Sequence, residues 1–436
     1  MANIHVGQKT AEGFIKSHMV IDDSELSATY EPKGAAAAAV APKLDKTEAA
    51  TTYASTRTIR PNGNTTVFLG DSNTYLPGGG MVPVWAYQAA VKSRQRIKFN
   101  AIYATPGDTI QEASDRWLDT ILALSPAPSA CIIALGTNDT NRNTGTAFNM
   151  ATNSASYLNI VNKLKARGIA PIATQIIPNN AASTVIQTNI QRWNRQLRVL
   201  GDTYGFPVID TYTPLVNTAN GQIQAAYLDT SDGLGLHLTN VGRKKFAETI
   251  AADAAPLYPP APNLTAKFGT DPTNLVPWST GWANYNDTAG GVVVGNKAPV
   301  AGDNLSGTWR EVTYTGTTSH LQQTGTILPT VPPAGRLYQF SGRVQSTGVE
   351  AAVAAGNASY IRVRIEFRND ASASLGYMLG IYDWNVDADG TFCLEQVPPV
   401  GTTRFVVQVE AGKASAGTPI VLRVGELTVR DLTSMV

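Results

Sequence analysis

Three polar side chains in this sequence lie at the ends of segments that have the pattern of buried elements. Ser72 and Asn138 each follow an apolar run, and His237 directly precedes a helical pattern. A serine hydroxyl is a weak nucleophile that needs a neighbouring base, and histidine suits that role because its ordinary pKa lies near neutrality. These residues therefore predict acyl transfer, with Ser72 as the nucleophile and His237 as the base.

Acyl transfer also needs hydrogen-bond donors that face the oxyanion of the transition state. The candidate donors are the backbone N–H groups of Ser72 and Gly107 and the side-chain amide of Asn138. We interpret Asp71 and Asp139 as loop organisers rather than catalysts, because short carboxylates bind nearby backbone N–H groups. Taken singly, each of these residues could instead cap a helix or shape a turn.

The segment from residue 65 to about 255 alternates between strand-like and helix-like patterns. The strand-like runs are continuous and apolar, as in parallel strands covered by helices on both faces. They span 65–69, 97–104, 130–135, 170–177 and 207–212, and the helix-like runs span 84–93, 109–124, 148–167, 186–204 and 241–254. This alternation predicts an α/β domain with a doubly wound parallel sheet, whose ligand site lies beyond the carboxyl ends of the strands.

Composition divides the 436 residues into four predicted parts. Residues 1–60 form a leader with an alanine-rich run and few large apolar side chains, and residues 61–255 form the α/β domain. A proline-rich linker at 256–263 leads to residues 264–436, which predict an antiparallel β-sandwich of jelly-roll type. The clearest period-two alternation lies at 360–367, 404–410 and 421–429.

Composition also argues against several classes of protein. The formal net charge is +1 with no basic stripe, which argues against a nucleic-acid partner. No apolar run reaches the roughly 18 residues of a membrane helix, and the first residues lack a signal-peptide pattern. The only cysteines, Cys131 and Cys393, are predicted to be buried free thiols. With four histidines and no Cys/His cluster, we expect neither a metal nor a cofactor.

Two features of the C-terminal region allow two interpretations each. Its aromatic side chains could stack on sugar rings, although filling a sandwich core is the better interpretation. These are Trp278, Trp282, Tyr285, Trp309, Tyr382 and Trp384. The acidic run with Asp383, Asp387 and Asp389 could bind calcium, but it lacks the EF-hand spacing and is interpreted as an acidic turn.

The set of motifs resembles the SGNH (GDSL-like) hydrolase family over roughly residues 65–255. The first block is matched by Gly70-Asp71-Ser72 and the second by Gly107. The third is matched by Gly136-Thr137-Asn138-Asp139 and the fifth by His237, in the family's order. The resemblance implies a flavodoxin-like sheet and an acyl-Ser72 intermediate, with Ser72, Gly107 and Asn138 forming the oxyanion hole.

The sequence departs from this family at the catalytic acid. The family places that acid three residues before the histidine, where this chain has Leu234. A two-residue insertion with two glycines could loop out and leave Asp232 beside His237, so Asp232 is the predicted third member of the triad. Asp229 is an alternative, as is a Ser–His pair oriented by a backbone carbonyl.

Members of this family hydrolyse lipid esters, thioesters or O-acetyl groups on polysaccharides, and the linked β-sandwich favours a carbohydrate O-acetylesterase. Residues 29–46 resemble the attachment region of bacteriophage tail fibres and tailspikes. That resemblance implies a homotrimer in the virion tail, made in the host cytoplasm and joined to other tail proteins by its N-terminus. The expected partner is a bacterial surface polysaccharide, either O-antigen or capsule. The alternatives are a free extracellular O-acetylesterase and a non-catalytic glycan-binding tail adhesin.

Overall fold

A computed structural model describes most of the chain after residue 57. The described residues are 58–75, 84–141, 148–180, 184–231, 233–261, 275, 282–285, 292–300, 308–316, 320–324, 335–412, 414 and 418–433. The predicted leader therefore lies outside the described residues, apart from its last three positions. So does the predicted acid Asp232.

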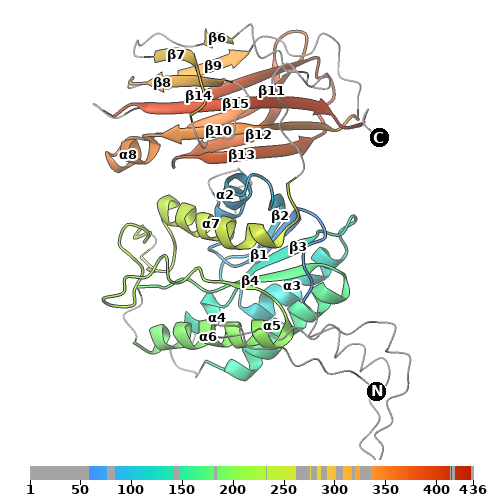
Figure 1. Cartoon of the computed structure of the whole chain (residues 1–436), viewed down its shortest axis with the longest axis vertical. Helices are drawn as coiled ribbons and strands as arrows, with labels where there is room; N and C mark the ends of the chain where they lie inside the picture. The colour runs from blue at the N-terminus through green and yellow to red at the C-terminus, as the bar shows by residue number, and fades with distance from the viewer. Residues whose placement is uncertain are drawn as a thin grey trace, which may run out of the picture. The chain divides into compact units, whose positions relative to one another are not determined.

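The first part of the described chain contains a parallel five-stranded sheet (Figure 1). Its strands are β1 (Thr65–Gly70), β2 (Lys98–Ala104), β3 (Ala130–Ala134), β4 (Ala170–Thr174) and β5 (Val208–Ile209). They lie in the order β2-β1-β3-β4-β5, and every neighbouring pair is parallel. The strand order reverses between β1 and β3, where a ligand site is expected in such sheets. The predicted doubly wound sheet is confirmed.

Helices cover both faces of this sheet, because alternate strand residues face opposite sides. One face packs Val67 and Cys131 under α3 (Ile110–Leu122), α5 (Met150–Ala166) and α6 (Thr184–Tyr204). The other packs Phe68 and Ile132 under α2 (Trp85–Lys92) and α7 (Asn240–Ala254). Burial on both faces explains why the strands are continuous apolar runs in the sequence.

Side-chain caps fix where several of these helices begin. Thr109 accepts a hydrogen bond from the Glu112 N–H, and the Glu112 carboxylate accepts one from the Thr109 N–H at 2.8 Å. This capping box starts α3 directly after the loop that carries Gly107. Asn149 caps α5 and Thr239 caps α7, so the last cap lies two residues after His237. Such caps contribute about 1 kcal/mol each and set the register of the loops that precede the helices.

Several local expectations differ from the structure, among them the strand predicted over 170–177, which ends as β4 at Thr174. The last strand was predicted over 207–212, but β5 ends at Ile209 because Asp210 begins a turn. The Asp210 carboxylate accepts hydrogen bonds from the N–H groups of Tyr212 and Thr213, which competes with strand pairing. The short helix α4 (Thr137–Asn141) was not predicted, because five polar residues carry no apolar periodicity.

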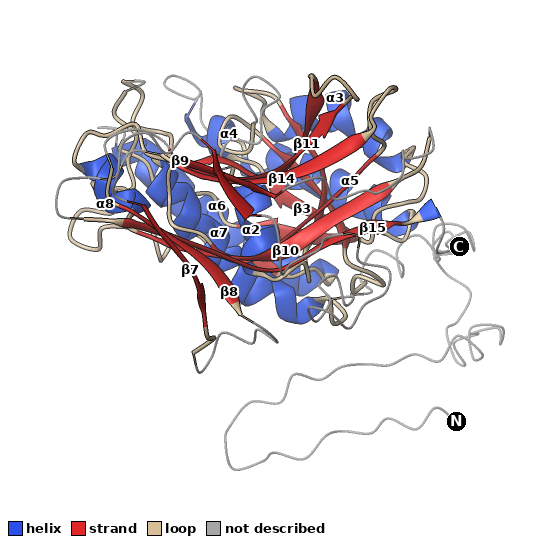
Figure 2. Cartoon of the chain, turned by 90° about the horizontal axis from the view of Figure 1, so that it is seen from above, coloured by secondary structure: helices blue, strands red, loops and turns tan. Residues whose placement is uncertain are grey.

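The C-terminal region contains two antiparallel five-stranded sheets, whose strands are β6 (Trp282–Tyr285), β7 (Val292–Lys297), β8 (Trp309–Tyr314), β9 (His320–Thr324), β10 (Tyr338–Thr347), β11 (Ile361–Arg368), β12 (Ser374–Trp384), β13 (Asp389–Gln396), β14 (Arg404–Ala411) and β15 (Ile420–Asp431). The strand orders are β13-β10-β15-β8-β7 and β12-β11-β14-β9-β6. Figure 2 shows the C-terminal sheets from above, with β10 and β15 of the first and β11 and β14 of the second labelled. A helix, α8 (Val349–Ala354), follows β10. The inward-facing residues of both sheets share one apolar core. The expected antiparallel β-region is therefore present.

Helix α2 belongs to the core of the C-terminal sheets as well as to the α/β domain. Tyr87 and Val91 of α2 pack in the same apolar cluster as the sandwich residues. The Tyr87 hydroxyl donates to the Gly380 carbonyl at 2.6 Å, and the Gln95 amide donates to the Thr391 carbonyl at 2.7 Å. Lys98 pairs with Glu395 at 2.6 Å. Buried contacts therefore join the two regions directly.

The start of the predicted linker also packs on the α/β domain. A short 3-10 helix, η2 (Ala255–Leu257), continues α7, and the Tyr258 side chain is buried against the sheet. The Tyr258 hydroxyl is hydrogen-bonded to Thr66 at 3.0 Å, and its carbonyl accepts a bond from Arg96. Up to residue 261 this proline-rich segment is therefore attached to the domain, and 262–270 lie outside the described residues.

The remaining predictions for the C-terminal region can be compared with its contacts. Trp309 and Trp384 are buried, as the core interpretation expects, and the guanidinium of Arg362 lies 5.1 Å from the Tyr382 ring. Trp278 and the side chains of Trp282 and Tyr285 lie outside the described residues. Both cysteines are buried and free, as predicted, and burial raises the pKa of the Cys393 thiol to about 12.

Each aspartate of the acidic run has its own partner within the protein. Asp383 pairs with Arg362, Asp387 accepts a hydrogen bond from the Val349 N–H, and Asp389 pairs with Lys92 at 3.1 Å. Three side chains held by three different partners do not converge on one point. These contacts support the acidic-turn interpretation.

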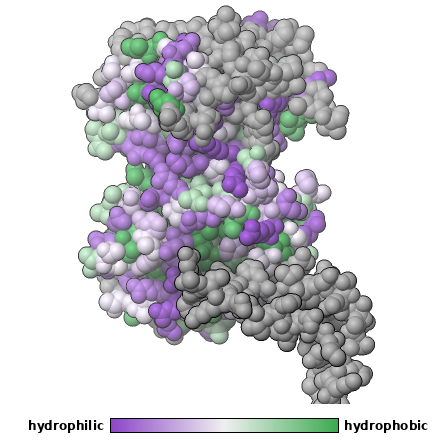
Figure 3. Space-filling view, viewed as in Figure 1, coloured by the Kyte–Doolittle hydropathy of each residue, from purple (hydrophilic) through white to green (hydrophobic). Residues whose placement is uncertain are grey.

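The surface of the described residues mixes hydrophilic and hydrophobic side chains (Figure 3). Large apolar side chains that are exposed occur singly, and scattered ones of this kind are normal in folded proteins. Tyr75 and Leu234 are two of them, each within three residues of Ser72 or His237 in the sequence. Within the described part of the chain, no helix is both long enough and apolar enough to cross a bilayer.

Candidate active site

The loop after β1 holds Ser72 at the carboxyl edge of the sheet. The Asp71 carbonyl accepts hydrogen bonds from the N–H groups of Thr74 and Tyr75 at 3.0 and 2.9 Å, so the chain turns sharply at the serine. A Cβ on Gly70 would lie 2.1 Å from Thr74 Oγ1, so the turn requires glycine there. Ser72 is half-buried on this turn, whereas Asp71 is buried.

His237 reaches this serine from the loop before α7, 165 residues later in the sequence. Its Nε2 lies 2.8 Å from Ser72 Oγ, which is hydrogen-bonding distance for a base and its nucleophile. The histidine backbone is held by a hydrogen bond from the Asp229 N–H to the His237 carbonyl at 2.9 Å and by a bridge between Leu228 and Leu238. The structure thus brings together the predicted nucleophile and base.

The two other predicted oxyanion residues lie after the neighbouring strands. Gly107 follows β2 with φ of +85°, and Asn138 is the second residue of α4, after β3. The Asn138 amide donates to the Asp108 carbonyl at 2.9 Å, and the Ile110 N–H donates to the Asp139 carboxylate at 3.1 Å. Two hydrogen bonds running in opposite directions therefore fix these two loops against each other.

Gly136 allows α4 to begin directly at the sheet edge. Its φ is +120°, and a Cβ there would lie 2.4 Å from Nε1 of the buried Trp193. Any other residue would strain the backbone and displace the indole, which would move Asn138. The glycine of the third block therefore has a packing role, which its sequence neighbours alone do not reveal.

The sequence comparison agrees with this geometry. Residues 68–245 match the GDSL-like Lipase/Acylhydrolase family. The match includes Ser72, Gly107, Asn138 and His237, and the resemblance inferred from the motifs is confirmed. No curated protein matches the chain.

Parts of this chain are also similar to solved structures. A putative lipolytic protein of the G-D-S-L family from Desulfitobacterium hafniense is 19% identical, with a TM-score of 0.37 over 44% of this chain and 99% of that one. An acetyl xylan esterase is 18% identical, with a TM-score of 0.35 over 43% and 98%. The enzymatically active domain of bacteriophage CBA120 tailspike protein 4 is 14% identical, with a TM-score of 0.26 over 48% and 24%.

The third member of the triad stays a prediction in this GDSL-like domain. Asp232 lies outside the described residues. The carboxylate of the alternative, Asp229, accepts hydrogen bonds from the N–H and hydroxyl of Ser231 at 2.9 and 2.6 Å. Asp229 therefore has a turn-forming role already, which favours Asp232 as the acid that orients His237.

Asp71 and Asp139 both organise loops, as expected. Asp139 holds the start of α3, and Asp71 Oδ1 accepts a hydrogen bond from the Asn73 N–H at 3.0 Å. Sequence reasoning missed how deeply Asp71 is buried. Burial raises the pKa of its carboxyl from 3.8 to about 6, and the nearby Asn73 N–H and Thr137 side chain offset only part of that shift. No sequence signal separates this inward-facing aspartate from an exposed one.

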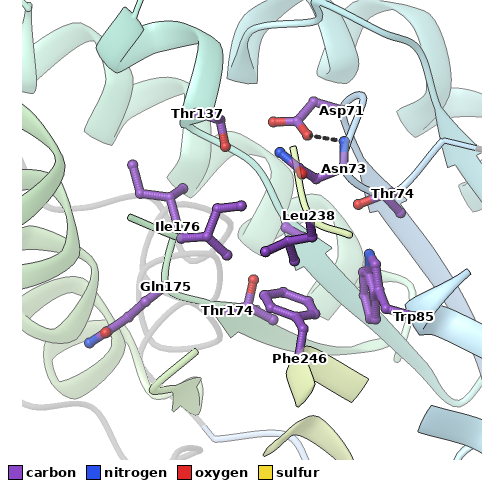
Figure 4. A pocket seen from close by; sticks show the side chains of 12 residues that line it. Asp71, Asn73, Thr74, Trp85, Thr137, Thr174, Gln175, Ile176, Leu238 and Phe246 are labelled. Atoms are coloured by element: carbon purple, nitrogen blue, oxygen red, sulfur yellow. Dashed lines mark hydrogen bonds between the residues drawn. The ribbon is translucent and has the colours of Figure 1, made fainter. Parts of the chain in front are cut away.

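A small cavity of about 20 Å³ lies beneath the nucleophile loop (Figure 4). It is lined by Asp71, Asn73, Thr74, Trp85, Ala134, Thr137, Thr174, Gln175, Ile176, Ile177, Leu238 and Phe246. These residues come from the ends of β1, β3 and β4, from α2, α4 and α7, and from the loop before α7. Among the described residues there is no group of three or more histidine, cysteine or acidic side chains that could hold a metal ion.

Proposed function

We propose that this chain is a serine esterase that removes O-acetyl groups from a bacterial surface polysaccharide through an acyl-Ser72 intermediate. The observation that carries the proposal is the 2.8 Å contact between His237 Nε2 and Ser72 Oγ, at the sheet edge that Gly107 and Asn138 share. The GDSL-like family match supports hydrolysis of carboxylic esters.

In the proposed reaction, Ser72 Oγ attacks the ester carbonyl while His237 Nε2 takes the hydroxyl proton. The tetrahedral oxyanion accepts hydrogen bonds from the N–H groups of Ser72 and Gly107 and from the Asn138 amide. Collapse of the intermediate breaks the ester bond, and His237 gives its proton to the departing sugar oxygen, which leaves as a hydroxyl group. Water then attacks acetyl-Ser72 with His237 as base, which releases acetate and restores the serine.

Two features support a carbohydrate ester over a lipid ester. The loops around Ser72 and Asn138 are rich in asparagine, threonine and glycine rather than large apolar residues. The β-region is joined to the catalytic domain by buried contacts of α2, so it can present a polymer at a fixed position relative to the site. Small acyl groups suit a site at an open sheet edge.

We further propose that the protein is a virion tailspike that attaches to other tail proteins through its N-terminus and assembles as a homotrimer. The composition of residues 29–46 supports this part of the proposal. Sedimentation equilibrium of the full chain tests the oligomeric state. A monomer would favour the first alternative, a free extracellular O-acetylesterase.

The decisive experiment measures acetate release from O-acetylated O-antigen and capsule preparations, together with turnover of p-nitrophenyl acetate. Wild type and Ser72→Ala are compared. We expect wild type to act on both substrates and the variant on neither. Turnover of the model ester without acetate release from any polysaccharide would leave a serine esterase with a different substrate. No turnover of either by wild type would favour the second alternative, a glycan-binding adhesin.

A further inference from the structure

Asp71 occupies an unusual position for a residue next to a nucleophile. Its side chain points into the protein, is 1% exposed, and accepts a hydrogen bond from the Asn73 N–H through Oδ1. Oδ2 is buried without a hydrogen-bond partner. A loop-organising aspartate needs only one such bond, whereas burying a second, unpaired carboxylate oxygen costs free energy. The position therefore calls for a further explanation.

The cavity beneath the loop shows what this carboxyl group faces. Asp71 Oδ2, Thr74 Oγ1 and Trp85 Nε1 are all buried without partners, and all three residues line the cavity (Figure 4). Leu238, the residue after His237, lines the same cavity. The residue before Ser72 and the residue after His237 therefore border the same cavity. At about 20 Å³ the cavity can admit about one water molecule.

Two titratable groups act on the Asp71 carboxyl through their charge. His237, from the loop before α7, stabilises its ionised form, and Asp139 of α4 opposes ionisation. The other elements that line the cavity contribute uncharged side chains, among them Trp85 of α2, Thr174 of β4 and Phe246 of α7. Of these two groups, His237 is the one that favours the ionised form of the carboxyl.

We propose that Asp71 is a positioning residue whose carboxylate stabilises the imidazolium form of His237 while that ring holds the proton of Ser72. This inference rests on the proposed serine esterase. The interaction is stronger in the transition state than in the resting enzyme, because His237 gains its positive charge only as Ser72 attacks. It acts from beneath the nucleophile, whereas the predicted acid Asp232 would act from the loop before the histidine.

The proposal has a consequence for pH. Burial places the pKa of Asp71 at about 6, so the carboxyl is charged at pH 8 and largely neutral at pH 5. Its contribution to catalysis should therefore disappear as the pH falls through about 6. A purely structural role predicts no such change, because a neutral carboxyl still accepts the Asn73 hydrogen bond.

The test compares kcat for p-nitrophenyl acetate between wild type and Asp71→Asn from pH 5 to pH 8.5. Asparagine keeps the shape and the acceptor oxygen but removes the charge. We expect the ratio of wild-type to variant kcat to be about 10 at pH 8, equivalent to about 1.4 kcal/mol, and to approach 1 at pH 5. We expect KM to be unchanged. Asp253→Asn, an exposed position on α7, is the matched control and should give a ratio of 1 throughout.

A ratio that is constant with pH, or equal to 1 throughout, would overturn the proposal and leave Asp71 as a loop organiser. If wild type turns over no acyl ester, the serine esterase itself fails, and this outcome is distinct from an active enzyme with an unchanged ratio. If Asp71→Asn does not fold, carboxyl NMR can follow the Asp71 titration in wild type and in His237→Ala. The midpoint of the Asp71 titration should rise when the His237 imidazole is removed, and an unchanged midpoint would refute the coupling.

Discussion

His237 Nε2 and Ser72 Oγ lie 2.8 Å apart although 165 residues separate them in the chain. The serine depends on the tight turn after β1, and the histidine depends on a backbone bridge between its own loop and residues 228 and 229. Between them in the sequence lie four further strands, β2 to β5, and their helices. The contact therefore forms only when the whole parallel sheet is assembled. A substitution in either loop should lower activity more than it lowers the stability of the fold.

The Asn138 amide is expected to stabilise the oxyanion. We predict that Asn138→Ala lowers kcat for p-nitrophenyl acetate by about 10²- to 10³-fold, the usual cost of losing one oxyanion donor. Steady-state kinetics provide the measurement. The matched control is Asn149→Ala, which removes the cap of α5 and should cost about 1 kcal/mol of stability without lowering kcat. Equal activity in the two variants would show that the Asn138 amide does not act as an oxyanion donor.

The acid of the triad can be identified by paired substitutions. If Asp232 orients His237, we expect Asp232→Asn to lower kcat by about 10²- to 10⁴-fold. Asp229→Asn should lower it less than tenfold, because the Asp229 carboxylate is bonded to Ser231. The reverse order of effects would identify Asp229 as the acid. Small effects from both would indicate a Ser–His pair oriented by a backbone carbonyl.

The burial of Asp71 predicts how stability depends on pH. Its pKa is about 6 in the folded protein against 3.8 ordinarily, so the folded state holds this proton more tightly than the unfolded state. The resulting stabilisation is fully present below about pH 3.8 and is lost as the pH rises through about 6. The ionised carboxyl should therefore cost about 3 kcal/mol at pH 7.

Urea unfolding of wild type and Asp71→Asn isolates this contribution from those of other carboxyl groups. At pH 7 the variant should be more stable by up to about 3 kcal/mol, and the difference should close between pH 6 and pH 4. A variant that is less stable than wild type at pH 7 would contradict this prediction. It would show that hydrogen bonds stabilise the ionised Asp71 carboxyl more than burial destabilises it.

The joint between the two regions should contribute measurably to stability. Tyr87→Phe removes the 2.6 Å hydrogen bond to the Gly380 carbonyl and should cost about 1 kcal/mol or more, because both groups are buried. Tyr377→Phe, at a partly exposed position, is the control and should cost less than about 0.5 kcal/mol. Differential scanning calorimetry measures both. Equal effects would mean that the Tyr87 contact contributes little to the joint.

Much of the α/β domain could be predicted because its signals are local. Strands buried on both faces are continuous apolar runs, and the helices begin at caps such as Thr109 and Thr239 that can be recognised in the sequence. Ser72, Gly107 and Asn138 were placed at one edge because each follows a parallel strand. The C-terminal strands were less predictable, since several are short and their order depends on pairing between distant segments.

The sequence by itself determined the residue types of the site, their order along the chain and the parallel sheet that carries them. Only the tertiary structure decided that Ser72 and His237 are in contact, that Asp71 points inward, and that α2 packs in the core of the β-region. The physical reason is that periodicity and capping are properties of neighbouring residues. Burial, pKa and side-chain contact are set instead by segments that meet only after the chain has folded.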